Sequence, residues 1–418
     1  MSIKSSLQKS ILFAVVSMSC ATLGLAKSHH DAPAWVGTWA ASQQIPEPAN
    51  ALSAEDLHDM TLRQNVHLTV PGQSLRVHMS NAFGTTPLHL SSVHVAHPLS
   101  PAEARIDPAS DHALTFSGKS DVVIPAGAEY ISDPIAYPLT ALSDLSITLH
   151  LDTPPEQQTG HPGSRATSYL VHGDMVAAPD LPNAKRIDHW YWIAGIDVNA
   201  VKDSAAIVVL GDSITDGHGA TTNGNDRWPD VLARELQAGR KTKILSVLNQ
   251  GIGGNHLLTD GLGPNALSRL DRDVVAQAGV RYLIVLEGVN DLGKLSHEGE
   301  VPQAQHEILV QQMIGAYEQI VLRAHAHGIK VFGATILPYV GSGYYHPAPP
   351  NEADRVAINQ WIRQPGHFDA VIDFDQVTAD PSHTDQMLPA YDSGDHLHPS
   401  PAGYRTMAYA VPKTLFSH

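Results

Sequence analysis

Short runs of alternating apolar and polar residues fill the first half of the chain. The clearest cover residues 62–70, 75–79 and 145–151. An alternation with a period of two is typical of strands that bury one face. Proline, glycine, asparagine and aspartate interrupt the rest of this half at short intervals, and no amphipathic helix of useful length is apparent. The pattern therefore predicts an antiparallel β-sandwich over residues 35–197.

From residue 198 onward, apolar strands alternate with helical patterns. Residues 205–210 form a continuous apolar run, which is typical of a strand buried on both faces. Later strands are predicted at residues 244–248, 282–286, 330–336 and 370–374, and the clearest helices at residues 303–327 and 351–362. This succession of strand and helix predicts a parallel α/β domain over residues 198–418.

The composition is that of a globular protein. Of the 418 residues, 43% are hydrophobic and 16% are charged, which is enough apolar material for two cores. Lysine and arginine number 26 and aspartate and glutamate 42, so the formal net charge is −16. An acidic surface repels the phosphates of nucleic acid. We therefore expect no nucleic-acid partner.

Residues 1–26 have the features of a secretory signal peptide. Two lysines precede an apolar segment over residues 11–26 that ends in small residues. This segment predicts a secreted or periplasmic protein, and no other apolar run is long enough to give the mature chain a transmembrane span. The single cysteine, Cys20, lies inside it. Acylation of Cys20 as a lipoprotein site is an open alternative, although Ser17 stands where such sites usually have leucine.

Four segments rich in polar residues and glycine mark the second half. They are residues 211–213, 249–255 and 287–291, each of which follows a predicted strand, and residues 395–399 near the C-terminus. The carboxyl ends of parallel strands meet at one edge of a sheet, where ligands bind in open α/β folds. We therefore expect the four segments to contribute to one site.

Together these segments supply what acyl transfer requires. Such chemistry needs a nucleophile, a base, a group that orients the base, and hydrogen-bond donors for the oxyanion. Ser213 is the candidate nucleophile, His398 the base, and Asp395 the residue that holds the imidazole tautomer. The candidate oxyanion donors are the backbone N–H groups of Ser213 and Gly254 and the side-chain amide of Asn290.

The blocks GDSITDG, NQGIGGN, GVND and DHLHP resemble the four signature blocks of the SGNH, or GDSL, hydrolases, in their usual order. The resemblance spans roughly residues 204–416. It implies a flavodoxin-like three-layer α/β/α domain that hydrolyses esters. The residues that name the family fall on Ser213, Gly254, Asn290 and His398, with Asp395 as the orienting acid.

The first half carries a looser resemblance. Residues 35–41 and 76–85 look like secreted members of the family that have a β-sandwich ahead of the hydrolase domain. This supports the boundary between the two halves and identifies no substrate. The aromatic run at residues 189–192 is interpreted as packing at the junction of the halves, with a sugar-stacking platform as the alternative.

Some of these residues also fit other kinds of site. Residues 251–254 are glycine-rich like a dinucleotide-binding loop, but that motif needs glycine at position 256, where His256 stands. Asp395, His396 and His398 have metal-binding side chains, yet no second cluster with ligand spacing accompanies them. We therefore expect neither a cofactor nor a metal. His396 also competes with His398 as the base, and the offset from Asp395 favours His398.

Other polar residues near the site have structural interpretations. Asp212 and Asp216 are expected to accept hydrogen bonds from backbone N–H groups, and Asp291 to cap the segment that follows it. The loop at residues 339–350 is interpreted either as a wall of the substrate pocket or as plain surface. Residues 29–31 are expected to belong to a flexible mature N-terminus.

The chain is thus predicted to be a serine ester hydrolase that forms an acyl-enzyme without metal or cofactor. Short-chain acyl esters are the favoured substrates, as small molecules or as acetylated polysaccharide. A lipase or lysophospholipase of the same family is one alternative, although it would need an apolar rim or lid and no spare apolar helix is apparent. A second alternative is a carbohydrate-binding envelope protein with an inactive hydrolase domain. The complete set of site residues argues against this alternative.

Overall fold

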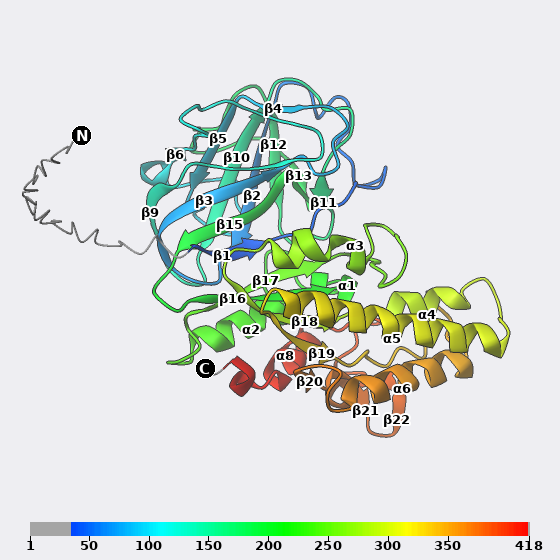
Figure 1. The fold of residues 1–418 in the computed structure, drawn as a ribbon. Coiled ribbons are helices and arrows are strands. Elements are labelled where there is room, and N and C mark those ends of the chain that lie inside the picture. The colour runs from blue at the N-terminus through cyan, green and yellow to red at the C-terminus, as the bar shows by residue number, and fades with distance from the viewer. Residues whose placement is uncertain (1–34, 417–418) are drawn as a thin grey trace, which may run out of the picture. The chain divides into compact units, whose positions relative to one another are not determined.

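Antiparallel strands make up the first half of the described chain, which covers residues 35–416 of a computed structural model (Figure 1). In sheet order, the first sheet consists of β1 (Trp35–Ala40), β15 (Ile193–Asn199), β3 (Gly72–Ser80) and β8 (Glu129–Ile131), with β9 (Ile135–Leu139) also paired to β3. The second consists of β13 (Lys185–Ile187), β12 (Ser168–His172), β2 (Met60–His67), β10 (Asp144–Leu151), β5 (Ser92–Ala96) and β6 (His112–Ala113). Two smaller pairs join β4 (Leu88–Leu90) to β7 (Val122–Ile124) and β11 (Gly160–His161) to β14 (Trp190–Tyr191).

The two sheets share one hydrophobic core. Leu62 of β2, Leu75 of β3 and Ile147 of β10 are fully buried in the same cluster of apolar side chains. The three strands that alternation predicts are therefore confirmed. The described part of this half contains no helix longer than the 3₁₀ turn Pro108–Ser110.

The polar residues of β2 are also buried, although alternation predicts an exposed outer face. The Arg63 guanidinium donates hydrogen bonds to the carbonyl oxygens of Ala104 at 2.6 Å, Val176 at 3.2 Å and Ala178 at 2.8 Å. These carbonyls belong to loops that cross the outer face. The alternation of residues within β2 cannot reveal that loops bury its outer face, because these loops lie far away in the chain.

Five parallel strands form the sheet of the second half, as predicted. In sheet order they are β17 (Leu245–Gly251), β16 (Ala205–Gly211), β18 (Val280–Leu286), β19 (Lys330–Ala334) and β20 (Ala370–Ile372). Gly211 pairs with Gly251 on one side and with Leu286 on the other. Three of the four predicted site segments therefore begin at the same level of one sheet edge.

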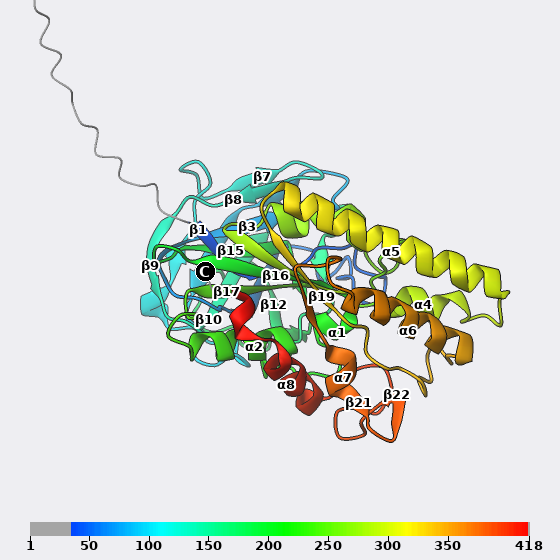
Figure 2. The same ribbon diagram turned by 60° about the horizontal axis from the view of Figure 1, so that its bottom comes forward.

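Helices cover both faces of this sheet, which confirms the three-layer α/β/α class. They are α1 (Ser213–Asp216), α2 (Trp228–Gln237), α3 (Ala266–Leu270), α4 (Val289–Leu295), α5 (Gln303–Ala326), α6 (Pro349–Arg363), α7 (Phe374–Thr378) and α8 (Pro401–Ala410), with a π-helical turn at Asp271–Val275 and a 3₁₀ turn at Lys413–Phe416. Helix α5 lies on one side of the strands, and α7 and α8 lie on the other (Figure 2). A short antiparallel pair, β21 (Ala379–Asp380) and β22 (His383–Met387), follows α7.

Strand β1 belongs to both cores. Val36 and Ala40 are buried in the core of the parallel sheet, whereas Trp39 is buried in the core of the first half. The Gly37 N–H donates a hydrogen bond to the Ala278 carbonyl at 2.9 Å. The first strand of the described chain therefore packs against the second half.

The aromatic run at residues 189–192 packs inside the protein. Trp190, Tyr191 and Trp192 are each at most 2% exposed, and the Trp190 ring meets the Trp39 ring edge to face at 5.0 Å between centroids. Buried rings cannot stack on a sugar in solvent, so the run is a packing element, although its rings belong to the core of the first half and not to that of the parallel sheet.

The signal peptide, Cys20 and residues 29–31 lie outside the described residues. Within residues 35–416, no helix has the combination of length and apolarity that crossing a bilayer requires.

His78 of β3 lies in a largely buried ion cluster. Its Nδ1 is 2.7 Å from Glu129 Oε1, and its Nε2 is 2.9 Å from Asp197 Oδ2. Burial alone would lower the pKa of His78, but the two carboxylates outweigh burial and raise this pKa from 6.5 to about 9. Because the folded-state pKa is the higher one, the cluster stabilises the fold fully below pH 6.5 and loses this contribution as the pH rises through 9.

The free energy of unfolding is expected to fall by about 3 kcal/mol between these two pH values through this group alone. Urea melts across that interval measure the slope. In a His78→Gln variant the slope should flatten, whereas replacing the exposed His325, which pairs with Asp369 elsewhere, should leave it unchanged. Parallel profiles for the wild type and His78→Gln would contradict the assignment.

Candidate active site

Ser213 begins the turn that follows β16. The Asp212 side chain caps helix α1 by accepting a hydrogen bond from the Ile214 N–H at 2.9 Å, as expected for this carboxylate. Gly211 must be small here, because a Cβ on it would lie 2.8 Å from the Leu286 carbonyl oxygen. Strand end and cap together fix the position of the Ser213 hydroxyl.

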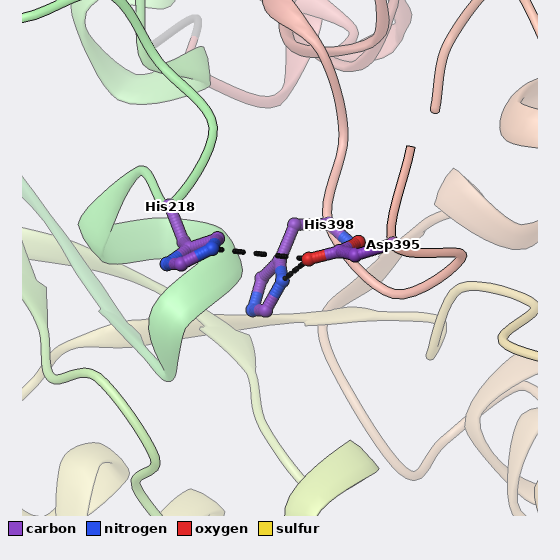
Figure 3. Close-up of side chains that lie close together, drawn as sticks. All are labelled: His218, Asp395 and His398. Carbon is purple, nitrogen blue, oxygen red and sulfur yellow. Dashed lines mark hydrogen bonds and ion pairs between the residues drawn. The ribbon is translucent and has the colours of Figure 1, made fainter. Parts of the chain in front are cut away.

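Ser213, His398 and Asp395 form one chain of hydrogen bonds. Ser213 Oγ is 2.8 Å from His398 Nε2, and His398 Nδ1 is 2.6 Å from Asp395 Oδ2. Figure 3 shows Asp395 beside the His398 ring. The structure therefore brings together the nucleophile, the base and the orienting acid that the sequence predicts, from loops 185 residues apart.

The ionisation of Asp395 fixes the proton positions in this chain. Its Oδ1 also accepts the backbone N–H groups of Leu397 at 2.9 Å and His398 at 2.8 Å. Burial would raise the pKa of the Asp395 carboxyl, but the hydrogen bonds from His398 outweigh it and hold this pKa well below its usual range. An ionised Asp395 only accepts, so His398 Nδ1 carries the proton and Nε2 is left to accept the Ser213 hydroxyl.

The predicted oxyanion donors lie next to Ser213. Ser213, Gly254 and Asn290 line one cavity of about 780 Å³. The Asn290 Nδ2 donates to the Asn255 carbonyl at 2.6 Å, and its Oδ1 accepts from the Tyr345 hydroxyl at 2.7 Å. These two bonds fix the orientation of the amide and leave its second N–H unused. Within residues 35–416, the backbone N–H groups of Ser213 and Gly254 have no protein partner.

A buried arginine ties the strand ends together. The Arg269 guanidinium donates to the carbonyl oxygens of Gly211 at 3.0 Å and Gln250 at 2.6 Å, to Asn255 Oδ1 at 2.7 Å and to Glu287 Oε1 at 3.2 Å. Each of these four residues belongs to or adjoins one of the predicted site segments. Arg269 therefore holds three segments in one arrangement, although it lies outside all of them in sequence.

The carboxyl groups around this arginine are strongly perturbed. Burial and the nearby charge of Asp212 raise the pKa of Glu287 well above its usual range. Burial, together with the charges of Asp291 and Asp216, raises the pKa of Asp212 to about 7 despite its backbone hydrogen bond. One buried guanidinium thus lies among several acids whose ionisation burial opposes.

Two acidic residues have roles that differ from those expected. Asp291 does not cap helix α4, whose N-terminal cap is Gly288; its carboxylate accepts the backbone N–H groups of Leu257 at 2.7 Å and Leu258 at 3.0 Å. It thereby anchors the segment that follows Gly254. This role depends on a loop 33 residues earlier in the chain, which no local pattern could indicate.

Asp216, the last residue of α1, binds a histidine from the first half and not backbone N–H groups. His161 Nε2 is 2.9 Å from Asp216 Oδ1, and both side chains are buried. His161 Nδ1 lies 2.8 Å from the Ser42 carbonyl, which can only accept. Nδ1 therefore donates to that carbonyl, and one further proton lies between His161 Nε2 and Asp216 Oδ1.

The loop at residues 339–350 forms one wall of the cavity. Gly341, Gly343, Tyr344 and Tyr345 line it, and Tyr345 reaches Asn290. The loop is therefore a wall of the pocket, which was one of its two interpretations, and not plain surface.

His396 is not the base, as its offset from Asp395 predicted, and His218, which the sequence did not single out, lies beside His398. His396 is exposed and its Nδ1 pairs with Asp392 Oδ2 at 2.6 Å, so it is not part of the Ser213 chain. The ring of His218 instead lies over that of His398, with 4.1 Å between centroids, and His218 Nε2 is 3.8 Å from Asp395 Oδ2.

These positions also change the candidate metal ligands. His218, Asp395 and His398 offer ligand atoms within 4.8 Å of one another (Figure 3). His396 is not among them. A cation at this place would draw on Asp395 and His398, which already bond to each other.

The comparison with known families covers the part of the chain that holds this site. The model of the GDSL-like lipase/acylhydrolase family matches residues 209–406. This part of the chain belongs to that family. All four predicted signature blocks lie inside the match, so the family resemblance is confirmed. The chain is an ester-cleaving hydrolase of the GDSL-like type.

Solved structures with similarity to the chain include three with informative names. A protein of the G-D-S-L family from Desulfitobacterium hafniense DCB-2 is 25% identical, with 50% of this chain and 97% of that one covered and a TM-score of 0.37. A GDSL-like lipase from Bacteroides thetaiotaomicron is 18% identical (51% and 89% covered, TM-score 0.37). The aryl esterase of M. smegmatis is 17% identical (51% and 98% covered, TM-score 0.39). No curated protein matches the chain.

Proposed function

We propose that this GDSL-like hydrolase is a secreted esterase that cleaves short-chain acyl esters through a covalent acyl-enzyme on Ser213. The observation that carries the proposal is the chain of hydrogen bonds from Ser213 through His398 to Asp395. The signal-like segment at residues 1–26 supports secretion.

The first half-reaction forms the acyl-enzyme. Ser213 Oγ attacks the ester carbonyl carbon while its proton passes to His398 Nε2, and the carbonyl oxygen becomes an oxyanion. The backbone N–H groups of Ser213 and Gly254 and the free N–H of Asn290 stabilise this charge. The bond to the alcohol oxygen then breaks, and the alcohol leaves with the proton from His398.

The second half-reaction repeats these steps with water. His398 takes a proton from a water molecule as its oxygen attacks the acyl carbon, and the same donors hold the second oxyanion. The bond to Ser213 Oγ breaks, His398 returns the proton to Ser213, and the carboxylic acid leaves. Asp395 stays ionised throughout and stabilises the imidazolium that forms twice.

The surroundings of the cavity favour a short acyl group on a polar alcohol such as a carbohydrate. Only Leu262 and Tyr344 among its lining residues are large apolar side chains with substantial exposure, at 52% and 65%. Two side chains do not form the broad apolar rim that a lipid-directed enzyme presents. The intact hydrogen-bonded triad argues against an inactive, purely carbohydrate-binding protein.

Hydrolysis of p-nitrophenyl acetate, butyrate and octanoate by the purified protein tests the proposal. We expect kcat/KM to fall from acetate to octanoate by at least about tenfold, because only Leu262 and Tyr344 among the lining residues offer a long chain a large, exposed apolar side chain. A maximum at octanoate would replace the proposal with a lipase. Absence of turnover on all three esters would favour the carbohydrate-binding alternative.

A further inference from the structure

The cavity beside Ser213 has a charge opposite to that of the whole chain. The chain has a formal net charge of −16, with 42 acidic and 26 basic residues. Among the residues that line the cavity, however, Asp395 is the only acid, and Arg165 and Lys294 stand beside several histidines. Two cationic side chains therefore face one carboxylate, which is already engaged by His398, so the lining has an excess of positive charge.

Arg165 reaches the cavity from the first half of the chain. Its backbone is in the left-handed region at φ 49°, and the Asn223 N–H donates to its carbonyl at 2.8 Å. Its side chain forms no ion pair within residues 35–416, and its Nε is buried without a hydrogen-bond partner there. A buried donor without a partner is costly, and an acceptor on a bound molecule would remove that cost.

The charge of Arg165 acts close to the reacting groups. Burial and the charges of His398 and Arg165 lower the pKa of His218. The His218 ring in turn lies over that of His398. An anionic group that approaches Arg165 is therefore near the residue that handles the proton of the reaction.

Lys294 supplies a second positive charge from another direction. It stands four residues after Asn290 on helix α4, so the two side chains share one face of the helix. It is exposed and, like Arg165, has no ion-pair partner in the described part of the chain. By contrast, Arg355 and Arg363 are both held by carboxylates away from the cavity.

The acids beneath the cavity are each held by other groups, although the charge of Lys294 also reaches Asp291. Asp291 is bound by two backbone N–H groups, and Glu287 is bound by Arg269. Asp216 is paired with His161. Each of these carboxyl groups is buried, and none of them lines the cavity.

We infer that the natural substrate is an anionic ester, which carries a carboxylate, sulfate or phosphate that Arg165 and Lys294 bind. The inference rests on the proposed function, since it assigns the substrate class of the same site. Arg165 presents a planar pair of donors suited to such oxyanions, and Lys294 adds a point charge beyond the oxyanion donor Asn290.

Matched pairs of esters test the inference. For a charge on the alcohol part, the pair is 4-acetoxybenzoate and its methyl ester; for a charge on the acyl part, it is p-nitrophenyl hydrogen succinate and p-nitrophenyl butyrate. Each kcat/KM is divided by the rate constant for hydroxide-catalysed hydrolysis of the same ester, which removes differences in intrinsic reactivity. In the wild type we expect the anionic member of at least one pair to be favoured at least about fivefold, and added salt to reduce this preference.

Variants show whether the two cations cause the preference. Arg165→Gln and Lys294→Gln should each lower the ratio of anionic to neutral kcat/KM at least about threefold, because the anionic ester loses more than the neutral ester does. Arg165→Lys keeps a charge and should retain most of the preference. Lys330→Gln is the matched control, because it removes an exposed charge from the first residue of β19, at the opposite edge of the sheet.

The outcomes separate the inference from the proposed function. Equal normalised rates for both members of each pair in the wild type would overturn the inference while leaving a Ser213-dependent esterase intact. An equal loss on both esters in Arg165→Gln and Lys294→Gln would assign these residues a structural role and would also overturn it. Failure to hydrolyse any of the four esters would contradict the proposed function itself.

Discussion

Replacement of Ser213 by alanine is expected to lower kcat for p-nitrophenyl acetate by at least about 10⁴-fold. Alanine removes only the oxygen that bonds His398, and Ser213 is almost completely buried, so the turn and the cavity should keep their shape. Without the hydroxyl no acyl-enzyme forms, and only direct attack by water remains. Steady-state kinetics with a substrate concentration above KM measure the loss.

A second buried serine provides the control for this experiment. Ser246 lies on β17, beside the nucleophile strand, and its hydroxyl has no hydrogen-bond partner among the described residues. Ser246→Ala should therefore leave kcat within about twofold. Mass spectrometry after a rapid acid quench should find one acyl group on Ser213 in the wild type. Turnover by Ser213→Ala close to that of the wild type would refute the nucleophile assignment.

Replacement of Asp395 by asparagine is expected to lower kcat by about 10³–10⁴-fold without unfolding the protein. The asparagine oxygen can still accept the N–H groups of Leu397 and His398, which leaves its NH₂ group facing His398 Nδ1. Nδ1 must then accept, so the proton of the neutral ring moves to Nε2. A protonated Nε2 cannot take the proton of Ser213, and the base is lost although every atom stays in place.

The same loop offers a matched control. Asp392 binds His396 at 2.6 Å and accepts two backbone N–H groups, much as Asp395 does for His398. Asp392→Asn removes an identical charge from a neighbouring carboxylate–histidine pair, and it should change kcat by less than about threefold. A loss as large as that of Asp395→Asn would show that the loop as a whole, and not the tautomer of His398, controls activity.

Much of the site was predictable because its parts are local. Ser213 follows a continuous apolar strand, and Asp395 and His398 are three residues apart on one turn, so these residues, the other polar segments and the family resemblance together indicate their roles. Parallel strands place their carboxyl ends at one edge, which brings these parts together with Gly254 and Asn290. Their contacts within the fold agree with that expectation.

The supporting residues were not predictable for a physical reason. Arg269, Arg165 and His218 carry no motif. Arg269 acts through groups as far away in the chain as Ser42, Arg165 enters the cavity from the first half, and His218 stacks on a ring from another loop. A lone arginine in a sequence is most often a solvated surface residue. Only the burial of the Arg269 side chain and the carbonyl groups around it reveal that it holds the strand ends in place.

The buried pair His161–Asp216 makes the hydrolase half depend on the half that precedes it. Asp216 of helix α1 pairs with His161, which lies outside residues 198–418. Joining those residues to a different leading domain would preserve the hydrolytic triad and still leave the buried Asp216 without its partner. The integrity of the nucleophile turn therefore depends on a strand that takes no part in catalysis.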